Sequence, residues 1–457
     1  MLERSGALTQ TERTRAERTR QSQNEESTMS VAAAEPKGNT AGTISYTDLY
    51  RRWEENNWSA MGLDYSKDRA GWDALDEMQR KSALWMYSMF FYGEDSVTDN
   101  LSPYIDAAPT EEQAYFLTTQ QVDEARHAIH FHRFFKEVLG AGDSVAETLE
   151  STLPQLNWGY TTVFDRLDRM ADELRADRSL PKFAQAITLY HMIVEGTLAQ
   201  PGQHYIEDFF TKDGTMPGFA EGMTHVSRDE QRHIGFGVKT LSEIVPQSDE
   251  CKAAIVELFR EVNKCSMSVF CPPNYDRAYT ECWGFSLEDI FAFSLKLIRQ
   301  RWKTIGFPLE EMPADVWPFD HDMPVEEIAS RQIKLMLAGV TGEHTDKPDS
   351  SPEIQEIFFD MISRTADPKA AGSGPFTTQW QFTDADPWHL VLDNGSTRAV
   401  SGQAANPDLT LKTDWAEWIS ISKNNQNPLK SIATRKLTPK GSPRALNTFR
   451  KMFPAGA

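Results

Sequence analysis

Apolar residues recur at every third or fourth position through most of residues 44–310, which is the spacing of an amphipathic helix. Strand-like alternation and close-set hairpin turns are scarce in this region, so the pattern predicts an all-α helix bundle. Within residues 182–211, Pro201 should kink or interrupt its helix, because proline has no N–H to donate. The stretches with helical spacing are 73–99, 110–140, 159–175, 182–211, 217–245, 249–267 and 286–305.

The hydrophobic pattern changes after about residue 352. EIQEIFFDMIS predicts an amphipathic helix, while TTQWQF, WHLVLDNGSTRAVSG and PDLTLKT predict strands, with a hairpin turn at Asn394-Gly395. DWAEWISIS returns to helix, and Asp414 is its expected N-cap. We therefore expect a smaller α+β domain after the bundle.

The remaining segments complete the expected organisation. Residues 1–42 contain almost no large apolar side chains and should be disordered, because they cannot bury enough surface to fold. Residues 311–351 hold many Pro, Asp and Glu residues around a short helix-like stretch, which indicates a linker. The predicted parts are a disordered segment (1–42), a helix-bundle domain (43–310), a linker (311–351) and an α+β domain (352–457).

Composition narrows the classes of function. The formal net charge of −20 argues against nucleic acid or an anionic membrane as the main partner. No apolar run approaches the roughly 18 residues of a membrane span, and the first residues lack the apolar core of a secretory signal. The four cysteines have no C-x-x-C spacing, so reduced thiols are expected. These features predict a cytoplasmic protein.

Two Glu-x-x-His motifs stand on inward-facing helix surfaces. VDEARHAIHFHRFF contains Glu124 and His127, and VSRDEQRHIGFGV contains Glu230 and His233. Side chains three residues apart share one face of a helix, and in both motifs that face continues into apolar residues. Burying a carboxylate is costly unless it is paired or bound to a metal. Both motifs therefore indicate that a cation lies inside the bundle.

Two further helices each place an acid among apolar neighbours, namely Glu94 in MYSMFFYGEDSV and Glu195 in LYHMIVEGTLA. A Glu from each of two helices plus a Glu-x-x-His from each of two others is the ligand set of dinuclear iron or manganese carboxylate proteins. Four carboxylates balance two divalent cations, and mixed oxygen and nitrogen ligation suits Fe and Mn. A single motif often arises by chance on a solvated face, whereas this combination rarely does. Asp229 is placed to accept a hydrogen bond from a ligating histidine across the bundle.

This constellation resembles the small subunit of class I ribonucleotide reductase and, more closely, the related ligand-binding oxidases. The resemblance covers about residues 44–310 and includes the segments LYRRWEENNWSAMGLDYSKDRAGW, GEDSVT and YHMIVEGTLA. In the reductase subunit a radical-bearing tyrosine usually follows the first ligand histidine by four residues, and here that position is Phe131. The resemblance therefore excludes a stable tyrosyl radical there, although a manganese–iron reductase subclass also has phenylalanine at this position.

The oxidase resemblance implies further roles. Members of that family join a valine and a tyrosine by an ether cross-link, and the matching residues here are Val97 and Tyr190. They hold a manganese–iron centre beside a long-chain fatty acid. By that resemblance one metal (Mn) is held by Glu94, Glu124 and His127, and the other (Fe, or Fe at both positions) by Glu195, Glu230 and His233, with some carboxylates bridging. A spacing of five residues turns an ideal α-helix by about 140°, so either Tyr190 reaches around the helix toward Glu195 or the helix carries a π-bulge. Trp58 is a candidate for the electron-relay tryptophan of the superfamily.

Residues 352–454 resemble a sterol-carrier-protein type two domain. The resemblance rests on WHLVLDNGSTRAVSGQAANPDLTLKTDWAEWISI and NPLKSIATRKLTPKG. Such domains enclose an apolar tunnel for acyl chains or sterols. The aromatic and aliphatic residues expected to line a tunnel, or else to form ordinary core, are Trp380, Phe382, Trp388, Leu390, Trp415 and Trp418.

Together these features predict a ferritin-like bundle that activates dioxygen at a dimetal site and acts as an oxidase or monooxygenase on a hydrophobic, fatty-acyl-type ligand. The superfamily implies a homodimer. One alternative is a manganese–iron ribonucleotide reductase subunit, which needs a partner-binding tail where this chain has a folded domain. Others are a lipid carrier without turnover and an N-oxygenase with an added histidine ligand, for which His191 and His225 are eligible.

Overall fold

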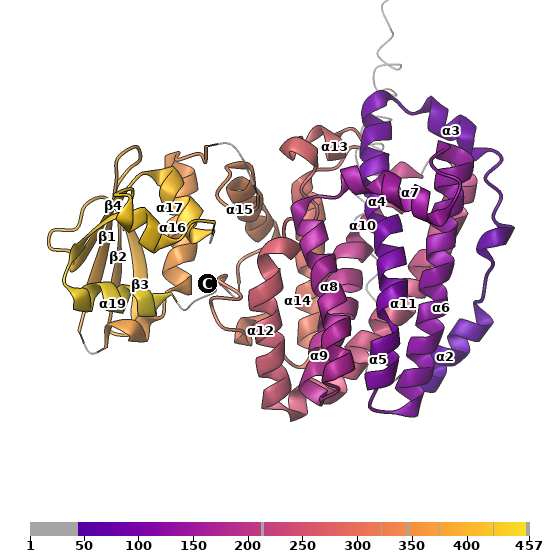
Figure 1. Cartoon of the computed structure of the whole chain (residues 1–457), viewed down its shortest axis with the longest axis horizontal. Helices are drawn as coiled ribbons and strands as arrows, with labels where there is room; N and C mark the ends of the chain where they lie inside the picture. The colour runs from indigo at the N-terminus through magenta and orange to yellow at the C-terminus, as the bar shows by residue number, and fades with distance from the viewer. Residues whose placement is uncertain are drawn as a thin grey trace, which may run out of the picture. The chain divides into compact units, whose positions relative to one another are not determined.

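The computed structural model describes residues 44–453, apart from 212–213, 321, 344–346, 373 and 424. The segment predicted to be disordered, 1–42, therefore lies outside the described residues. The described chain contains a helical bundle and a smaller domain with a mixed sheet (Figure 1). This agrees with the predicted fold class, whereas the exact domain boundaries stay predictions.

The bundle consists of long helices that lie side by side (Figure 1). α4 packs against α6, α12 against α8 and α9, and α14 against α15. Side chains at the helix starts fix where the key helices begin: Asp76 and Thr110 each form a capping box, with Gln79 and Gln113 respectively. The main helices of the bundle are α4 (Glu77–Asn100), α6 (Glu111–Phe134), α8 (Trp158–Ala176), α9 (Leu180–Ile187, which a π-helical segment continues), α11 (Pro217–Ile244), α12 (Asp249–Ser266) and α14 (Leu287–Ile305).

Shorter helices connect and cover the long ones. The short α-helices are α2 (Tyr46–Glu55), α3 (Asp68–Ala74), α5 (Ser102–Ala107), α7 (Val145–Thr152), α10 (Gln200–Tyr205), α13 (Ala278–Glu281) and α15 (Val325–Leu337). The 3₁₀ turns are η1 (Ala60–Gly62), η3 (Leu153–Gln155), η6 (Val245–Gln247), η7 (Pro273–Tyr275), η8 (Leu309–Glu311) and η9 (Pro368–Ala371). Within the described part of the chain, no helix combines the length and apolar composition needed to cross a bilayer.

Three segments have π-helical hydrogen bonding: η2 (Phe135–Leu139), η4 (Thr188–Ala199) and η5 (Ile206–Phe210). η4 continues α9 and leads directly into α10, so the chain stays helical through Pro201. The expected interruption at Pro201 is therefore wrong. At the end of η4 the N–H of Gln200 donates to the carbonyl of Glu195, five residues back. By the same spacing, an N–H at position 201 would donate to the carbonyl of Gly196, but Pro201 has no N–H. The guanidinium of Arg301 donates to that carbonyl instead, so it is not left unsatisfied.

The C-terminal domain packs helices against a five-stranded sheet in the order β3-β2-β1-β4-β5. β1 runs antiparallel to β2 and parallel to β4, while β3 and β5 pair antiparallel at the two edges. Its elements are α16 (Pro352–Thr365), β1 (Phe376–Phe382), β2 (Trp388–Asp393), β3 (Ser396–Ser401), β4 (Leu409–Thr413), α17 (Trp415–Ser422), α18 (Pro428–Ala433), β5 (Thr438–Gly441) and α19 (Pro443–Met452).

Local predictions for this domain are confirmed. Asn394 and Gly395 join β2 to β3 with φ angles of 49° and 77°, the left-handed backbone that a two-residue hairpin turn requires. Asp414 caps α17 by accepting a hydrogen bond from the N–H of Glu417. The rings expected to line a tunnel lie in the hydrophobic core, where Phe359 of α16 stacks on Trp388 with centroids 4.9 Å apart. Their role in binding an acyl chain stays a prediction.

Asp68 of α3 holds the start of α11, the helix that carries Glu230 and His233. Its fully buried carboxylate accepts the N–H groups of Gly218 (2.9 Å) and Phe219 (2.7 Å). We expect Asp68→Ala to lower the free energy of unfolding by about 1–3 kcal/mol, because these buried N–H groups lose their partner. The matched control is Asp73→Ala on the same helix, whose ion pair with Arg69 is exposed and contributes little. Urea unfolding followed by circular dichroism measures both, and equal stability of the two variants would contradict this role.

Candidate metal centre

Four helices of the bundle bring the six predicted ligands together. Glu94 comes from α4, Glu124 and His127 from α6, Glu195 from η4, and Glu230 and His233 from α11. Every one of these side chains is buried, the most exposed being Glu94 at 6%. Ligand atoms of Glu94, Glu124, His127 and Glu230 lie within 4.8 Å of one another, and so do those of Glu124, Glu195, Glu230 and His233. Glu124 and Glu230 belong to both groups, as bridging carboxylates would.

Each histidine presents its Nδ1 to several carboxylates at once. Nδ1 of His127 lies 3.2 Å from Glu94, 3.3 Å from Glu124 and 3.5 Å from Glu230. Nδ1 of His233 lies 3.1 Å from Glu124 and 3.4 Å from both Glu195 and Glu230. One ring nitrogen can donate only one proton, so hydrogen bonding alone cannot satisfy these oxygens. A shared cation at each position would.

Unsatisfied polar atoms support the same interpretation. Glu195 Oε2, Glu230 Oε2 and His233 Nδ1 are buried and have no hydrogen-bond partner. Buried polar atoms are nearly always paired, so three orphans in one cluster mark a place where something else binds. Burial raises the pKa of Glu94 and of Glu195 well above the usual range, because like charges crowd there in a dry interior. Two divalent cations would hold these groups as carboxylates, and the donor set fits Mn and Fe.

Two aspartates orient the histidines from the opposite side. Asp229 Oδ2 lies 3.3 Å from His127 Nε2, and Asp123 Oδ2 lies 3.2 Å from His233 Nε2. Each aspartate directly precedes the ligand glutamate of its own helix and contacts the ligand histidine of the opposite helix. The two motifs therefore orient each other reciprocally. This arrangement fixes which ring nitrogen faces the metal position. The placement of Asp229 agrees with the sequence-based expectation, whereas Asp123 was missed.

A cationic and aromatic layer holds the aspartates. Arg232 donates to Asp229 (2.7 Å) and to Asp123 (2.8 Å), and so joins the two motifs. Trp58 Nε1 donates to Asp229 at 2.7 Å, and Trp53 Nε1 donates to Asp123 at 2.8 Å. The repeated pattern D-E-x-R-H, in DEARH and DEQRH, carried the information that could have identified Asp123 and Arg232 from the sequence.

Gln120 and His191 form a third support. Gln120 Nε2 donates to Glu195 (2.8 Å) and Glu124 (3.3 Å), while its carbonyl oxygen lies 2.9 Å from His191 Nε2. Burial lowers the pKa of His191, so the ring is neutral and donates its Nε2 proton to Gln120. His191 thereby orients an amide and belongs to neither ligand group. His225 is also outside both groups and stacks on Trp58. Neither histidine therefore joins the ligand groups that the N-oxygenase alternative would extend.

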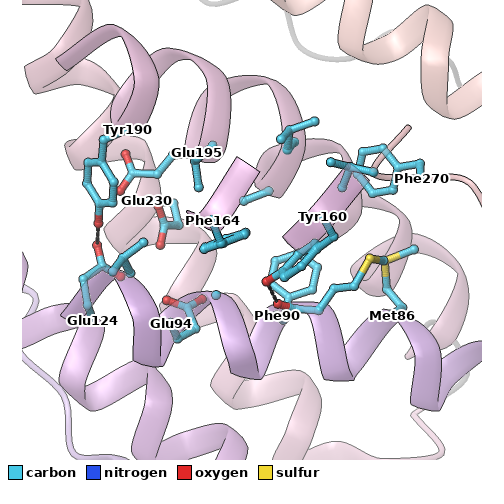
Figure 2. Close-up of a pocket in the computed structure, with 17 residues that line it drawn as sticks. Met86, Phe90, Glu94, Glu124, Tyr160, Phe164, Tyr190, Glu195, Glu230 and Phe270 are labelled. Atoms are coloured by element: carbon cyan, nitrogen blue, oxygen red, sulfur yellow. Dashed lines mark hydrogen bonds between the residues drawn. The ribbon is translucent and has the colours of Figure 1, made fainter. Parts of the chain in front are cut away.

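The π-helical stretch aligns Tyr190 with the cluster. Because η4 bonds at a spacing of five residues, Tyr190 and Glu195 lie one turn apart on the same face, which is the π-helical alternative of the two that the sequence left open. The Tyr190 hydroxyl donates to Glu124 at 2.7 Å (Figure 2). Val97, one turn after Glu94, lines the same cavity as Tyr190. Phe131 is buried beside Phe90 and has no hydroxyl to carry a radical.

An apolar cavity of about 60 Å³ opens beside the carboxylates. Figure 2 shows Glu94, Glu124, Glu195 and Glu230 at one side and Phe90, Tyr160, Phe164, Met86 and Phe270 at the other. The Tyr160 hydroxyl donates to the carbonyl of Met89. Beyond the carboxylates, the wall therefore offers a ligand almost only hydrocarbon contacts.

Comparisons with known proteins match the two parts of the chain separately. Residues 43–270, just under half of the chain, match the family model of the ribonucleotide reductase small chain. A solved R2-like ligand-binding oxidase, a tyrosine-to-phenylalanine variant with an aerobically reconstituted Mn/Fe cofactor, is 26% identical, with a TM-score of 0.50, covering 59% of this chain and 98% of that one. A glycine-to-phenylalanine variant with an anaerobically reconstituted Mn/Fe cofactor is 27% identical over 59% and 98%, with a TM-score of 0.48.

The helical part of the chain is thus a ferritin-like domain, and it is similar to the ribonucleotide reductase small chain. Residues 353–456 match the alkyl sulfatase C-terminal family model, so the sterol-carrier resemblance of this domain is not confirmed.

The two aspartates should control how tightly the cluster binds metal. We expect Asp123→Ala and Asp229→Ala each to weaken Mn²⁺ binding by roughly 10–100-fold, because each histidine loses the partner that orients it. Asp172→Ala, which removes an exposed pair with Arg175, is the control. Equilibrium dialysis followed by metal analysis gives the affinities, and Asp123→Asn and Asp229→Asn provide variants of conserved shape. Unchanged affinity in all four site variants would refute this role.

Proposed function

We propose that this chain is a dimetal-carboxylate oxidase or monooxygenase that uses dioxygen to oxidise a hydrophobic ligand. The observation that carries the proposal is that a buried cluster of four carboxylates and two histidines lies next to an apolar cavity. The similarity to an R2-like ligand-binding oxidase with a Mn/Fe cofactor supports the same reaction class.

The ligands divide between two metal positions. Glu94 and His127 would hold the first ion and Glu195 and His233 the second, with Glu124 and Glu230 shared. The pair is manganese with iron, or two irons, since both ions accept mixed oxygen and nitrogen ligands. When bound, the metals supply the redox chemistry with dioxygen. The protein keeps the site dry, fixes the histidines through Asp123 and Asp229, and presents the substrate along the apolar wall.

Tyr190 and Val97 are the residues through which oxidation would become visible in the protein itself. An ether cross-link replaces the Tyr190 O–H and one Val97 C–H bond by a C–O bond, and two electrons and two protons pass to dioxygen. Both side chains line the cavity, and the Tyr190 hydroxyl is already directed at Glu124. The phenol is therefore held by a carboxylate that can accept its proton.

Trp58 would connect the centre to an external electron donor. Its indole N–H, the Asp229 carboxylate and the His127 ring form a continuous hydrogen-bonded chain that ends at the first metal position. Trp58 also stacks with half-buried His225, at a centroid distance of 4.9 Å. A homodimer and a cytoplasmic location complete the proposal as the resemblance and composition predict them.

The cross-link gives the first test of function. Metal-free protein given Mn²⁺ and Fe²⁺ in air should yield a peptide pair joining Val97 to Tyr190, lighter by two hydrogens than the separate peptides. The same sample kept without air should not. Peptide mass spectrometry detects the link; Tyr190→Phe should abolish it, and Tyr104→Phe, which alters the ring packed edge-on against Tyr190, should retain it. Metal-loaded protein whose peptides stay separate in air would remove the cross-link from the proposal.

Turnover distinguishes an oxidase from a lipid carrier or a reductase subunit. We expect the metal-loaded protein to consume dioxygen faster when a long-chain fatty acid is added, and Glu195→Gln to lose most of this increase because the second metal position loses a charged ligand. An oxygen electrode records the rates, and Glu207→Gln on η5, outside both ligand groups, is the control. Fatty acid binding without any change in dioxygen consumption would favour the carrier.

A further inference from the structure

Charge is distributed unevenly along this acidic chain. Residues 418–457 contain eight Lys and Arg residues and no Asp or Glu, although the formal net charge of the whole chain is −20. The excess negative charge therefore belongs to the residues before 418. Charges separated by more than about 8 Å are largely screened at physiological salt, so the local sign of a surface decides what binds there.

The helix α19 is the centre of a basic surface on the C-terminal domain (Figure 1). Its residues Ala445 and Met452 are buried in the core of that domain. Arg444 and Lys451 are seven residues apart, so they lie two turns apart on one side of the helix, and both are exposed. Arg450 is exposed as well. α19 therefore presents apolar residues to the core and cations to the solvent.

Two neighbouring segments extend the positive charge. α19 packs against η9 and β5, which contribute the exposed side chains of Lys369 and Lys440. The contact with η9 includes a hydrogen bond of 2.8 Å from the N–H of Asp367 to the carbonyl of Met452. We use the name α19 surface for the five cations Lys369, Lys440, Arg444, Arg450 and Lys451.

The protein does not neutralise the α19 surface. None of its five cations forms an ion pair with a residue that the structure describes, whereas Lys436, nearby in the sequence, pairs with Glu417 at 3.2 Å. Two exposed acids adjoin η9 and β4, namely Asp367 and Asp408, and each already accepts a backbone N–H, at 2.9 and 2.8 Å. The surface thus keeps a positive charge that no internal structural role uses.

Aromatic rings border these cations. Phe449 of α19 contacts Trp380, Trp418 and Phe453, with centroid distances of 5.9, 6.3 and 5.4 Å, and it stays partly exposed. A basic helix with phenylalanine at its flank has the composition of helices that lie at the level of lipid head groups. Because Phe449 is surrounded by three rings, it offers no free face on which a nucleobase could stack. The α19 surface therefore fits a bilayer better than a nucleic acid.

We propose that the α19 surface docks this protein on bilayers that contain anionic phospholipids. Head-group phosphates would pair with the five cations, and the exposed edge of Phe449 would reach the boundary between head groups and acyl chains. The net negative charge of the rest of the chain favours this one orientation. Docking goes beyond the proposed function, because it brings the protein to the place where hydrophobic compounds accumulate and does not require the metal centre.

Sedimentation with vesicles tests docking on the full-length, metal-free protein. We expect binding to vesicles of equal parts phosphatidylcholine and phosphatidylglycerol, no binding to phosphatidylcholine alone, and release at roughly 1 M NaCl, where the Debye length is about 3 Å. Arg444→Gln combined with Lys451→Gln should weaken binding about 25-fold, because each cation near an anionic surface contributes about fivefold. Circular dichroism measures whether these variants keep the fold.

Two matched variants serve as controls. Lys67→Gln combined with Lys303→Gln removes two exposed cations of the helical domain and should leave binding unchanged. Arg444→Lys combined with Lys451→Arg keeps the charge and should bind like the wild type.

Three results would overturn docking: equal binding by the wild type and the Arg444→Gln, Lys451→Gln variant, equal binding to both kinds of vesicle, or binding to neither. Binding to a DNA duplex at the same salt without binding to vesicles would also overturn it and would identify a nucleic acid as the partner. Dioxygen consumption with dispersed fatty acid is measured separately. A failure of the proposed function therefore leaves the vesicle result intact, and a failure of docking leaves dioxygen consumption intact.

Discussion

Four carboxylates buried in one apolar interior are the constraint on which the rest of the helical domain depends. Glu94, Glu124, Glu195 and Glu230 cannot all remain ionised there without compensating positive charge. Arg232 and the nearby Arg126 do not provide it, because both guanidinium groups are paired with Asp123 and Asp229. The outer layer is neutral within itself, and the inner layer is left for cations.

The π-helical segment η4 is the backbone feature that brings Glu195 and Tyr190 to these carboxylates. An α-helix would turn Tyr190 away from Glu195, whereas η4 places both beside the cluster. The π-helical hydrogen bonding of η4 is stabilised by Arg301, a half-buried residue of α14 whose guanidinium donates to the carbonyl of Gly196 and to the side-chain oxygen of Gln200. A Cβ on Gly196 would lie 2.8 Å from the carbonyl oxygen of His191 and 2.9 Å from Nη1 of Arg301, so only glycine permits this contact. Pro201 is tolerated because the Gly196 carbonyl, to which it cannot donate, accepts a hydrogen bond from Arg301 instead.

The sequence predicted those features that are local or repeated. The Glu-x-x-His spacing sufficed to find both motifs, and the Asn-Gly pair sufficed to place a hairpin. Features that arise between helices were harder: the pairing of Asp123 with His233 depends on how α6 faces α11, and only the repeat of D-E-x-R-H hinted at it. The interruption expected at Pro201 was wrong because the effect of this proline depends on Arg301, about a hundred residues later in the chain. For the tryptophans of the C-terminal domain, the sequence alone could not distinguish core residues from tunnel-lining residues, because both positions require the same large apolar side chains.

The polar groups of the metal centre come from one part of the chain. The metal cluster and its supports come from residues 53–233, inside the region shared with the reductase small chain. A centre surrounded by hydrocarbon distinguishes substrates poorly, because methylene contacts differ little from one chain to the next. Closer selection among hydrophobic chains therefore requires contacts beyond the metal cluster and its supports.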